Sequence, residues 1–344
     1  MKVESLFSVF VFLFFSLSCQ KEKITLSSNA DDHIFVESDG ASMPVWMKGN
    51  TASGVILIFV HGGPGGSSMS NADASYMIPI QESFGVAYWD QRSSGSSQGN
   101  SNKDLTIDQY SEDLKMVINV LKKRYGSSTS IFLLAHSWGG TVSTSFLTKD
   151  ISNQQLIKGW ICMDGAFSPK EIFEESRKAI VNFGTIEIAQ NHKIDEWQPM
   201  VDYCNNNFPV DVATGLKINE MSFKAESLME DVYQATTTSG INNFNPNNIT
   251  ANIINQYATS HSDIIDEMFA TSFIDKLNLI NVPTLALWGK YDFTVPAVLA
   301  DTLAANIGTS EIINLILPHS GHSCAMNEPE LFSAGIISFV NLYK

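Results

Sequence analysis

The stretch IFLLAHSWGGTV, residues 131–142, decides the fold. Its first five residues predict a buried strand, and the residues after Ser137 predict a helix that follows at once. The small residues Ala135, Gly139 and Gly140 leave room for a strained, tight turn that lifts the serine hydroxyl clear of the sheet. Helix N-terminal amides stabilise negative charge, so an oxyanion beside Ser137 is favoured. A serine that only caps the helix is the alternative interpretation of these residues alone.

Outward from this stretch, strand and helix patterns alternate. The predicted strands are 33–38, 43–48, 54–60, 84–90, 131–135, 157–164, 283–289 and 312–318, and the predicted helices are 106–126, 139–149, one from about Val295 and one ending at Lys344. Strands that alternate with helices indicate an α/β fold with a mostly parallel sheet and helices on both faces.

The alternation is interrupted once. From residue 167 to 275 the pattern is helical and irregular, with an Asn-rich stretch at 239–256 that is typical of an exposed loop. An insertion of this size within a sheet predicts a helical cap, residues 167–275, over a core made of residues 32–166 and 276–344.

The N-terminus predicts a processing segment rather than part of the fold. Residues 6–17 form an apolar run that suits a signal-peptide core and is too short to span a bilayer. Ser18 precedes Cys19 in an arrangement that resembles the lipobox of bacterial lipoproteins. We therefore expect a signal peptide at 1–18, a lipid on Cys19, a polar tether over 19–31, and an exported protein anchored to a membrane. The alternatives are an ordinary cleaved signal with secretion and an uncleaved anchor.

Composition limits the partners and the cysteine chemistry. The 344 residues carry a formal net charge of −15, which argues against nucleic acid because phosphate binding needs a concentrated basic surface. Cys162 is expected to be a buried thiol, and a Cys204–Cys324 bridge is left open. We expect no metal or cofactor and no protein partner, because the cysteine spacings suit no metal site and the glycine-rich loop after the strand at 54–60 lacks a phosphate-binding lysine.

A serine needs a base to act as a nucleophile, and the base needs a group that orients it. Asp292 follows one predicted strand and His322 follows the next, so all three side chains lie at the carboxyl ends of strands. His319 is the rival base and Asp164 is the second candidate acid. Our prediction is Ser137 as nucleophile, His322 as base and Asp292 as the orienting acid.

The glycine-rich run FVHGGPGGSS, residues 59–68, is a candidate source of backbone amides for the predicted site. A glycine-rich turn directly after a buried strand can bring backbone amides close to the serine. We expect the amides of Gly63 and Trp138 to form an oxyanion hole.

Together these motifs resemble the proline iminopeptidase branch of the α/β-hydrolases. The matching motifs are HGGPGG (61–66), WDQRSSGSS (89–97), HSWGG (136–140), GKYDFTVP (289–296) and SGHS (320–323). The resemblance implies an α/β-hydrolase core under a helical cap, and release of an N-terminal residue, often proline, from short peptides or amides. Within the second motif, Asp90 to Arg92 are expected to form a structural ion pair or to brace loops beside the site.

The same resemblance implies that glutamates of the cap read the α-amine of the substrate. Glu171, Glu174 and Glu175 lie near the start of the cap, and Glu196 stands beside Trp197. Glu171 is also explained as a capping-box residue. An esterase or amide hydrolase that acts on a non-peptide small molecule, and a ligand-binding lipoprotein without catalysis, remain as alternatives.

Overall fold

The computed structural model describes residues 26–99, 105–234 and 249–344. The predicted signal peptide, Cys19 and most of the predicted tether lie outside these ranges. The first strand begins at Ala30, inside the predicted tether, so the folded part starts slightly earlier than expected.

The described residues form one sheet of eight strands. The strands are β1 (Ala30–Ser38), β2 (Ala41–Gly49), β3 (Val55–Val60), β4 (Gly85–Trp89), β5 (Ser130–His136), β6 (Gly159–Met163), β7 (Thr284–Gly289) and β8 (Ile312–Leu317). Their order in the sheet is β1-β2-β4-β3-β5-β6-β7-β8. β2 pairs antiparallel with β1 and β4, and the other neighbours pair in parallel.

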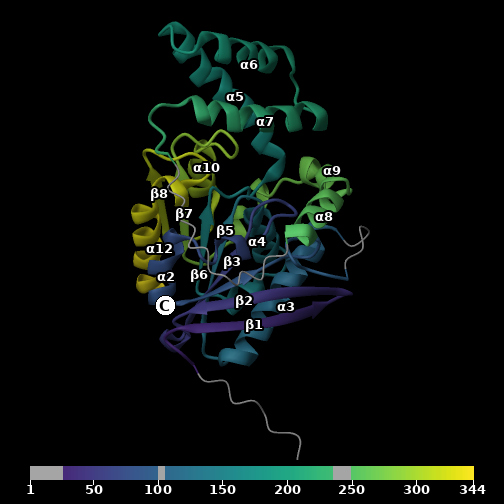
Figure 1. Cartoon of the computed structure of the whole chain (residues 1–344), viewed down its shortest axis with the longest axis vertical. Coiled ribbons are helices and arrows are strands. Elements are labelled where there is room, and N and C mark those ends of the chain that lie inside the picture. The colour runs from purple at the N-terminus through teal and green to yellow at the C-terminus, as the bar shows by residue number, and fades with distance from the viewer. Residues whose placement is uncertain (1–25, 100–104, 235–248) are drawn as a thin grey trace, which may run out of the picture.

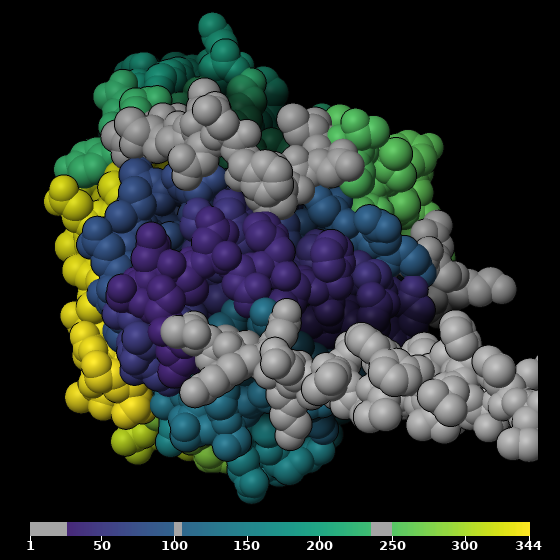
Figure 2. Space-filling model, turned by 60° about the horizontal axis from the view of Figure 1, so that its bottom comes forward, coloured from purple at the N-terminus to yellow at the C-terminus, as the bar shows by residue number. Residues whose placement is uncertain are grey.

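Helices cover both faces of the sheet (Figure 1). The helices are α2 (Ile78–Ser83), α3 (Ile107–Tyr125), α4 (Trp138–Lys149), α5 (Pro169–Ala189), α6 (Ile194–Asn206), α7 (Val212–Leu228), α8 (Ile249–Ser260), α9 (Ile264–Ala270), α10 (Val298–Asn306), α11 (Cys324–Asn327) and α12 (Pro329–Tyr343). α3, α4 and α10 pack on one face, whereas α2 and α12 pack on the other. Figure 2 shows the residues of β1 and β2, in purple, at the outer surface of one end of the molecule.

The central strands are apolar because both of their faces are covered. Every residue of β3 is buried, as is every residue of β6 and β7. A parallel strand between two helical layers has no solvent face, which explains its continuous apolar run. Because β5 lies between β3 and β6, Ser137 follows β5 near the middle of the carboxyl edge of the sheet.

Helices α5 to α9 come between β6 and β7 in the chain. Figure 1 shows α5, α6 and α7 above the carboxyl edge of the sheet, with α8 and α9 to one side. Trp197 on α6 and Phe293 of the core belong to one buried cluster that joins these helices to the sheet. The prediction of a loop at 239–256 is wrong from Ile249 onward, because α8 begins there. Residues 239–248 lie outside the described ranges.

The three cysteines that the structure describes, Cys162, Cys204 and Cys324, are buried free thiols, so Cys204 and Cys324 do not pair. Within the described ranges, no helix has the length and apolar character needed to cross a bilayer.

A buried ion pair ties the loop after β4 to α3. Arg92 Nε lies 2.5 Å from Asp113 Oδ2, and both side chains are fully buried. Asp113 also accepts a hydrogen bond from Ser38 at the end of β1. Breaking a buried pair is costly because one charge is left without compensation.

We expect Asp113→Ala to lower the free energy of unfolding by about 3–5 kcal/mol, because Arg92 would stay buried and uncompensated. Urea unfolding followed by circular dichroism measures the change. Glu112→Ala, on the same helix and paired with Lys149 at the surface, is the control and should stay within about 0.5 kcal/mol. Equal effects of the two substitutions would contradict a special role of the buried pair.

Candidate active site

The backbone of Ser137 adopts a conformation that few residues other than glycine tolerate. Its φ is 51° and its ψ is −121°, directly between β5 and α4. Its carbonyl accepts hydrogen bonds from the amides of Gly140 and Ala166, each at 2.8 Å. A Cβ atom at Gly139 would lie 2.0 Å from the carbonyl oxygen of Val60, so α4 can approach β3 only with glycine there.

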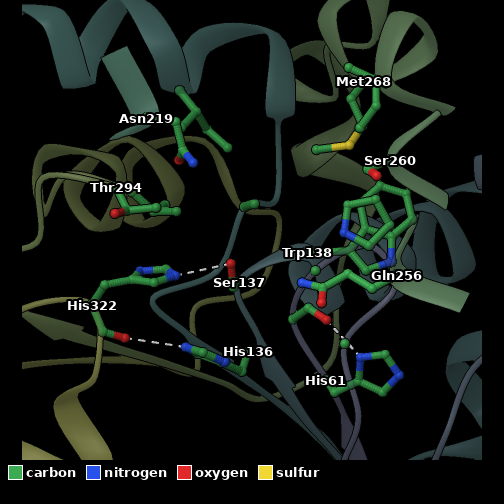
Figure 3. Close-up of a pocket in the computed structure, with 18 of the residues that line it drawn as sticks. His61, His136, Ser137, Trp138, Asn219, Gln256, Ser260, Met268, Thr294 and His322 are labelled. Atoms are coloured by element: carbon green, nitrogen blue, oxygen red, sulfur yellow. Dashed lines mark hydrogen bonds between the residues drawn. The ribbon is translucent and has the colours of Figure 1, made fainter. Parts of the chain in front are cut away.

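Three side chains from separate loops form a chain of hydrogen bonds. His322 Nε2 lies 3.0 Å from Ser137 Oγ, and His322 Nδ1 lies 2.8 Å from Asp292 Oδ2 (Figure 3 shows the first contact). The other carboxylate oxygen of Asp292 accepts from the amides of Thr294 and Val295. The structure thus brings together the predicted serine, histidine and aspartate, each at the carboxyl end of its strand.

Charge around His322 favours its protonated form. Burial by itself lowers the pKa of His322, but the nearby carboxylate of Asp292 and its hydrogen bond outweigh that effect and raise the pKa to about 9. An imidazole with a raised pKa is a stronger proton acceptor once it is neutral.

The two rival residues, Asp164 and His319, make hydrogen bonds to other groups. Asp164 is buried and accepts a hydrogen bond from the amide of Gly289. Burial first, and then the charge of Asp292, raise the pKa of Asp164 well above its usual range. The ring of His319 stacks on Tyr233 at 4.2 Å between centroids, and its Nδ1 contacts the carbonyl of Asp231.

The glycine-rich loop and the turn after β5 are held together by Gln91. Its side-chain amide donates to the carbonyl of His61 at 3.0 Å, and its Oε1 accepts from Trp138 Nε1 at 3.0 Å. Burial lowers the pKa of His61, whose Nδ1 contacts the carbonyl of Gly62 at 2.6 Å. No pattern in the sequence indicated this role of Gln91, although the residue lies within the motif WDQRSSGSS.

Asp90 fixes the continuation of the same loop. Its carboxylate accepts hydrogen bonds from the amides of Ser68 and Ser96, each at 2.9 Å. Together with the buried pair of Arg92 and Asp113, this contact shows that the motif forms an ion pair and also braces loops beside the site.

A cavity of about 560 Å³ opens above Ser137. Gly63 and Trp138, the predicted oxyanion-hole residues, both line it, and Gly62 approaches so closely that a Cβ there would lie 3.0 Å from Ser137 Cβ. Figure 3 shows Asn219 from α7 on one side of the cavity and Met268 and Ser260 on another. Apolar side chains form much of the wall: Ile172, Phe173, Leu216, Phe223, Ile265 and Phe269.

None of the four predicted cap glutamates lines this cavity. Their partners lie within the cap or at its edge: Glu171 accepts from Ser168 and Ser272, Glu174 pairs with Arg177, Glu175 with Lys178 and Glu196 with Lys224. Ser168 makes no side-chain hydrogen bond to the backbone of α5, so the capping box expected from the sequence does not form; its hydroxyl donates to the Glu171 carboxylate instead. Within the described ranges, no cluster of histidine, cysteine and carboxylate side chains could hold a metal ion.

Known proteins resemble both the sequence and the fold. Residues 52–330 match the family model described as "Serine aminopeptidase, S33". The chain is 23% identical over 293 residues to a "Probable aminopeptidase YbaC" of Bacillus subtilis, covering 81% of this chain and 86% of that protein. It is 26% identical over 298 residues to a "Proline iminopeptidase" of Saccharolobus solfataricus, covering 83% and 84% respectively.

Solved structures share the fold at lower identity. A proline iminopeptidase-related protein from Thermus thermophilus superposes with a TM-score of 0.62 and 19% identity, covering 91% of this chain and 98% of that one. An esterase from Exiguobacterium antarcticum superposes with a TM-score of 0.58 and 17% identity, covering 90% and 100%.

The imidazole of His136 offers a test of the site's electrostatics. Burial first, and then the charge of His322, lower the pKa of His136 to about 3, and its Nε2 lies 3.2 Å from the carbonyl of His322. Because the folded-state pKa is depressed, the ring should stay neutral throughout the range in which an ordinary histidine gains its proton.

We expect the Cε1 resonance that disappears in His136→Gln to keep a constant chemical shift from pH 8 down to about pH 5. Carbon-labelled histidine and two-dimensional NMR measure this titration. His192, which contacts Glu187 and Glu230 and whose pKa these carboxylates raise, serves as the titrating control. A midpoint near 6.5 for His136 would contradict the enclosed, neutral ring.

Proposed function

The chain belongs to the serine aminopeptidase family S33, and we propose that it releases N-terminal residues from short peptides by acyl-enzyme catalysis with Ser137, His322 and Asp292. The fold class predicted from the sequence, an α/β-hydrolase with a mostly parallel sheet, is confirmed by the family match and the solved structures. The protein is a serine hydrolase. The observation that carries the proposed roles is the continuous hydrogen-bond chain from Ser137 Oγ to the Asp292 carboxylate.

In the proposed mechanism, His322 Nε2 takes the proton of Ser137 while Oγ attacks the scissile carbonyl carbon. Asp292 holds the imidazole with its Nδ1–H toward the carboxylate and stabilises the imidazolium that forms. The amides of Gly63 and Trp138 stabilise the oxyanion. His322 then gives its proton to the leaving amine as the carbon–nitrogen bond breaks, which leaves an ester on Ser137. Water, deprotonated by His322, attacks this ester; as the bond between the acyl carbon and Oγ breaks, His322 gives the proton to Oγ of Ser137 and the acid is released.

The choice of an N-terminal residue as the acyl group is supported by the relatives. Two of them carry aminopeptidase names and match most of their own length. The cavity is bounded by the cap, which suits a short substrate better than a long chain. Its apolar wall suits the side chain of an apolar N-terminal residue, because burial of apolar surface drives such binding.

A second candidate is supported by the lining of the cavity. Among the described residues that line it, none is an aspartate or a glutamate. A protonated α-amine would be bound there by neutral groups such as Asn219, without the charge-assisted hydrogen bonds that a carboxylate provides. This lining favours the alternative activity, hydrolysis of an uncharged ester or amide by the same three residues.

We expect Ser137→Ala to lower kcat/KM by about 10⁴-fold or more, because the nucleophile is lost while the fold is kept. Steady-state hydrolysis measures the loss, and circular dichroism monitors the fold. Ser130→Ala, at the other end of β5, is the matched control and should keep the wild-type rate. Substantial turnover by purified Ser137→Ala would exclude the proposed nucleophile.

Paired substrates separate the two activities. We expect leucyl and prolyl arylamides with a free amine to be cleaved at least about tenfold faster, in kcat/KM, than their N-acetyl counterparts. The pair differs only at the amine, so the ratio reports amine recognition directly. Faster cleavage of the acetylated amides, or turnover confined to short p-nitrophenyl esters, would replace the aminopeptidase proposal with the second candidate.

A further inference from the structure

The cap helix α7 contacts His322 at two points. Glu226 Oε2 accepts a hydrogen bond of 2.8 Å from the backbone amide of His322. Phe223, on the same helix, lies edge-on to the His322 imidazole with 6.4 Å between ring centroids. Residues three apart share one face of a helix. One face of α7 therefore holds both the backbone and the ring of the proposed base.

The loop before His322 is shaped to admit Glu226. A Cβ atom at Gly321 would lie 1.9 Å from Cδ of Glu226, so the carboxyl group occupies the space that a side chain would take. The amide of Gly321 donates to Asn327 Oδ1, which fixes the loop from the core side. The contact with the cap thus depends on a residue without a side chain directly before the base.

Residues 229–234, which follow α7 and which we call the docking segment, extend this contact. The amide of Tyr233 donates to the carbonyl of His319 at 2.9 Å, and Asn327 Nδ2 donates to the carbonyl of Tyr233 at 2.6 Å. Asp231 Oδ2 accepts from the hydroxyl of Tyr291 at 2.6 Å. Since Tyr291 precedes Asp292, the cap contacts the loops that carry both the base and the acid.

We propose that Glu226 is a positioning residue: it holds the His322 amide from the cap and so makes the His322–Ser137 hydrogen bond depend on docking of the cap. The proposal rests on the proposed function, because it needs His322 to act as the base for Ser137. Glu226 lies outside the lining of the cavity and acts through the backbone of His322 rather than on the substrate.

The charge of Glu226 gives this role a distinct signature. Burial first, and then the nearby charge of Asp292, raise the pKa of Glu226 to about 7, while the amide and the charge of His322 oppose the rise. Asp292 and His322 are the titratable groups that face it. The carboxylate of Glu226 in turn helps to raise the pKa of His322. Loss of the charge should therefore lower the pKa of the base.

The test uses the rate at which a fluorophosphonate modifies Ser137, because this reaction needs the activated serine and no knowledge of the substrate. We expect Glu226→Ala to react roughly ten- to a hundredfold more slowly, since displacement of a catalytic group by about 1 Å costs this much. Glu226→Gln keeps an oxygen that can accept the His322 amide, so it should restore most of the rate. In Glu226→Gln, the acid limb of the labelling rate plotted against pH from 5 to 10 should shift to lower pH, because the pKa of His322 falls.

A control variant, thermal melting of Glu226→Ala and labelling of the wild-type protein complete the test. Glu220→Gln, an exposed carboxylate on the same helix that pairs with Lys217, is the control and should leave both rate and pH profile unchanged. A wild-type rate in Glu226→Ala, or an unmoved acid limb in Glu226→Gln, would overturn the proposal. If Glu226→Ala fails to fold by thermal melting, the pH profile of Glu226→Gln decides alone. Failure of the wild-type protein to be labelled at Ser137 would instead refute the proposed function itself.

A role of Glu226 in binding the substrate amine gives a different result. Both substitutions would then impair cleavage of free-amine arylamides equally, through KM, and neither would change the rate of phosphonate labelling. That pattern would also overturn the positioning role.

Discussion

The backbone of Ser137 has a φ of 51° because strands, a helix and the start of the cap meet around it. Its amide donates to Met163 at the end of β6, and its carbonyl accepts from Gly140 on α4 and from Ala166 at the entry to the cap. A strained residue keeps its conformation only where the surroundings determine it from several sides. The same backbone contacts therefore fix the position of the Ser137 hydroxyl, the start of α4 and the entry to the cap. The loops that carry His322 and Asp292 lie next to this turn.

The glycine-rich loop and the loop after β4 are also held by contacts at the carboxyl edge of the sheet. Gln91 joins the glycine-rich loop to Trp138, so the backbone amides on both sides of Ser137 are held in one hydrogen-bonded frame. Preorganised amides stabilise a developing oxyanion more effectively than mobile ones, because no reorganisation is needed during the reaction. The buried pair of Arg92 and Asp113 fixes this frame to α3.

The cap has two physical tasks in this molecule. Its helices supply much of the apolar wall of the cavity above Ser137. Its docking segment and Glu226 contact the loops that carry Asp292 and His322. If Ser137 and His322 act as proposed, a substrate that shifts the cap would also change the activation of Ser137, through the backbone hydrogen bond from His322 to Glu226.

The sequence by itself determined the strand–turn–helix at Ser137, the mostly parallel sheet and the order in which Ser137, Asp292 and His322 follow their strands. Apolar periodicity and turn residues are local properties, so they can be read without a fold. The helix that begins at Ile249 was missed because its asparagine-rich start is typical of a loop. Only the tertiary structure decided which other residues hold the site. Glu226, which accepts a hydrogen bond from the His322 amide, is 96 residues away from it in the chain, and the predicted cap glutamates pair with other residues. Contacts between such distant segments leave no local pattern in the sequence, because they form only when the sheet and the cap bring the segments together.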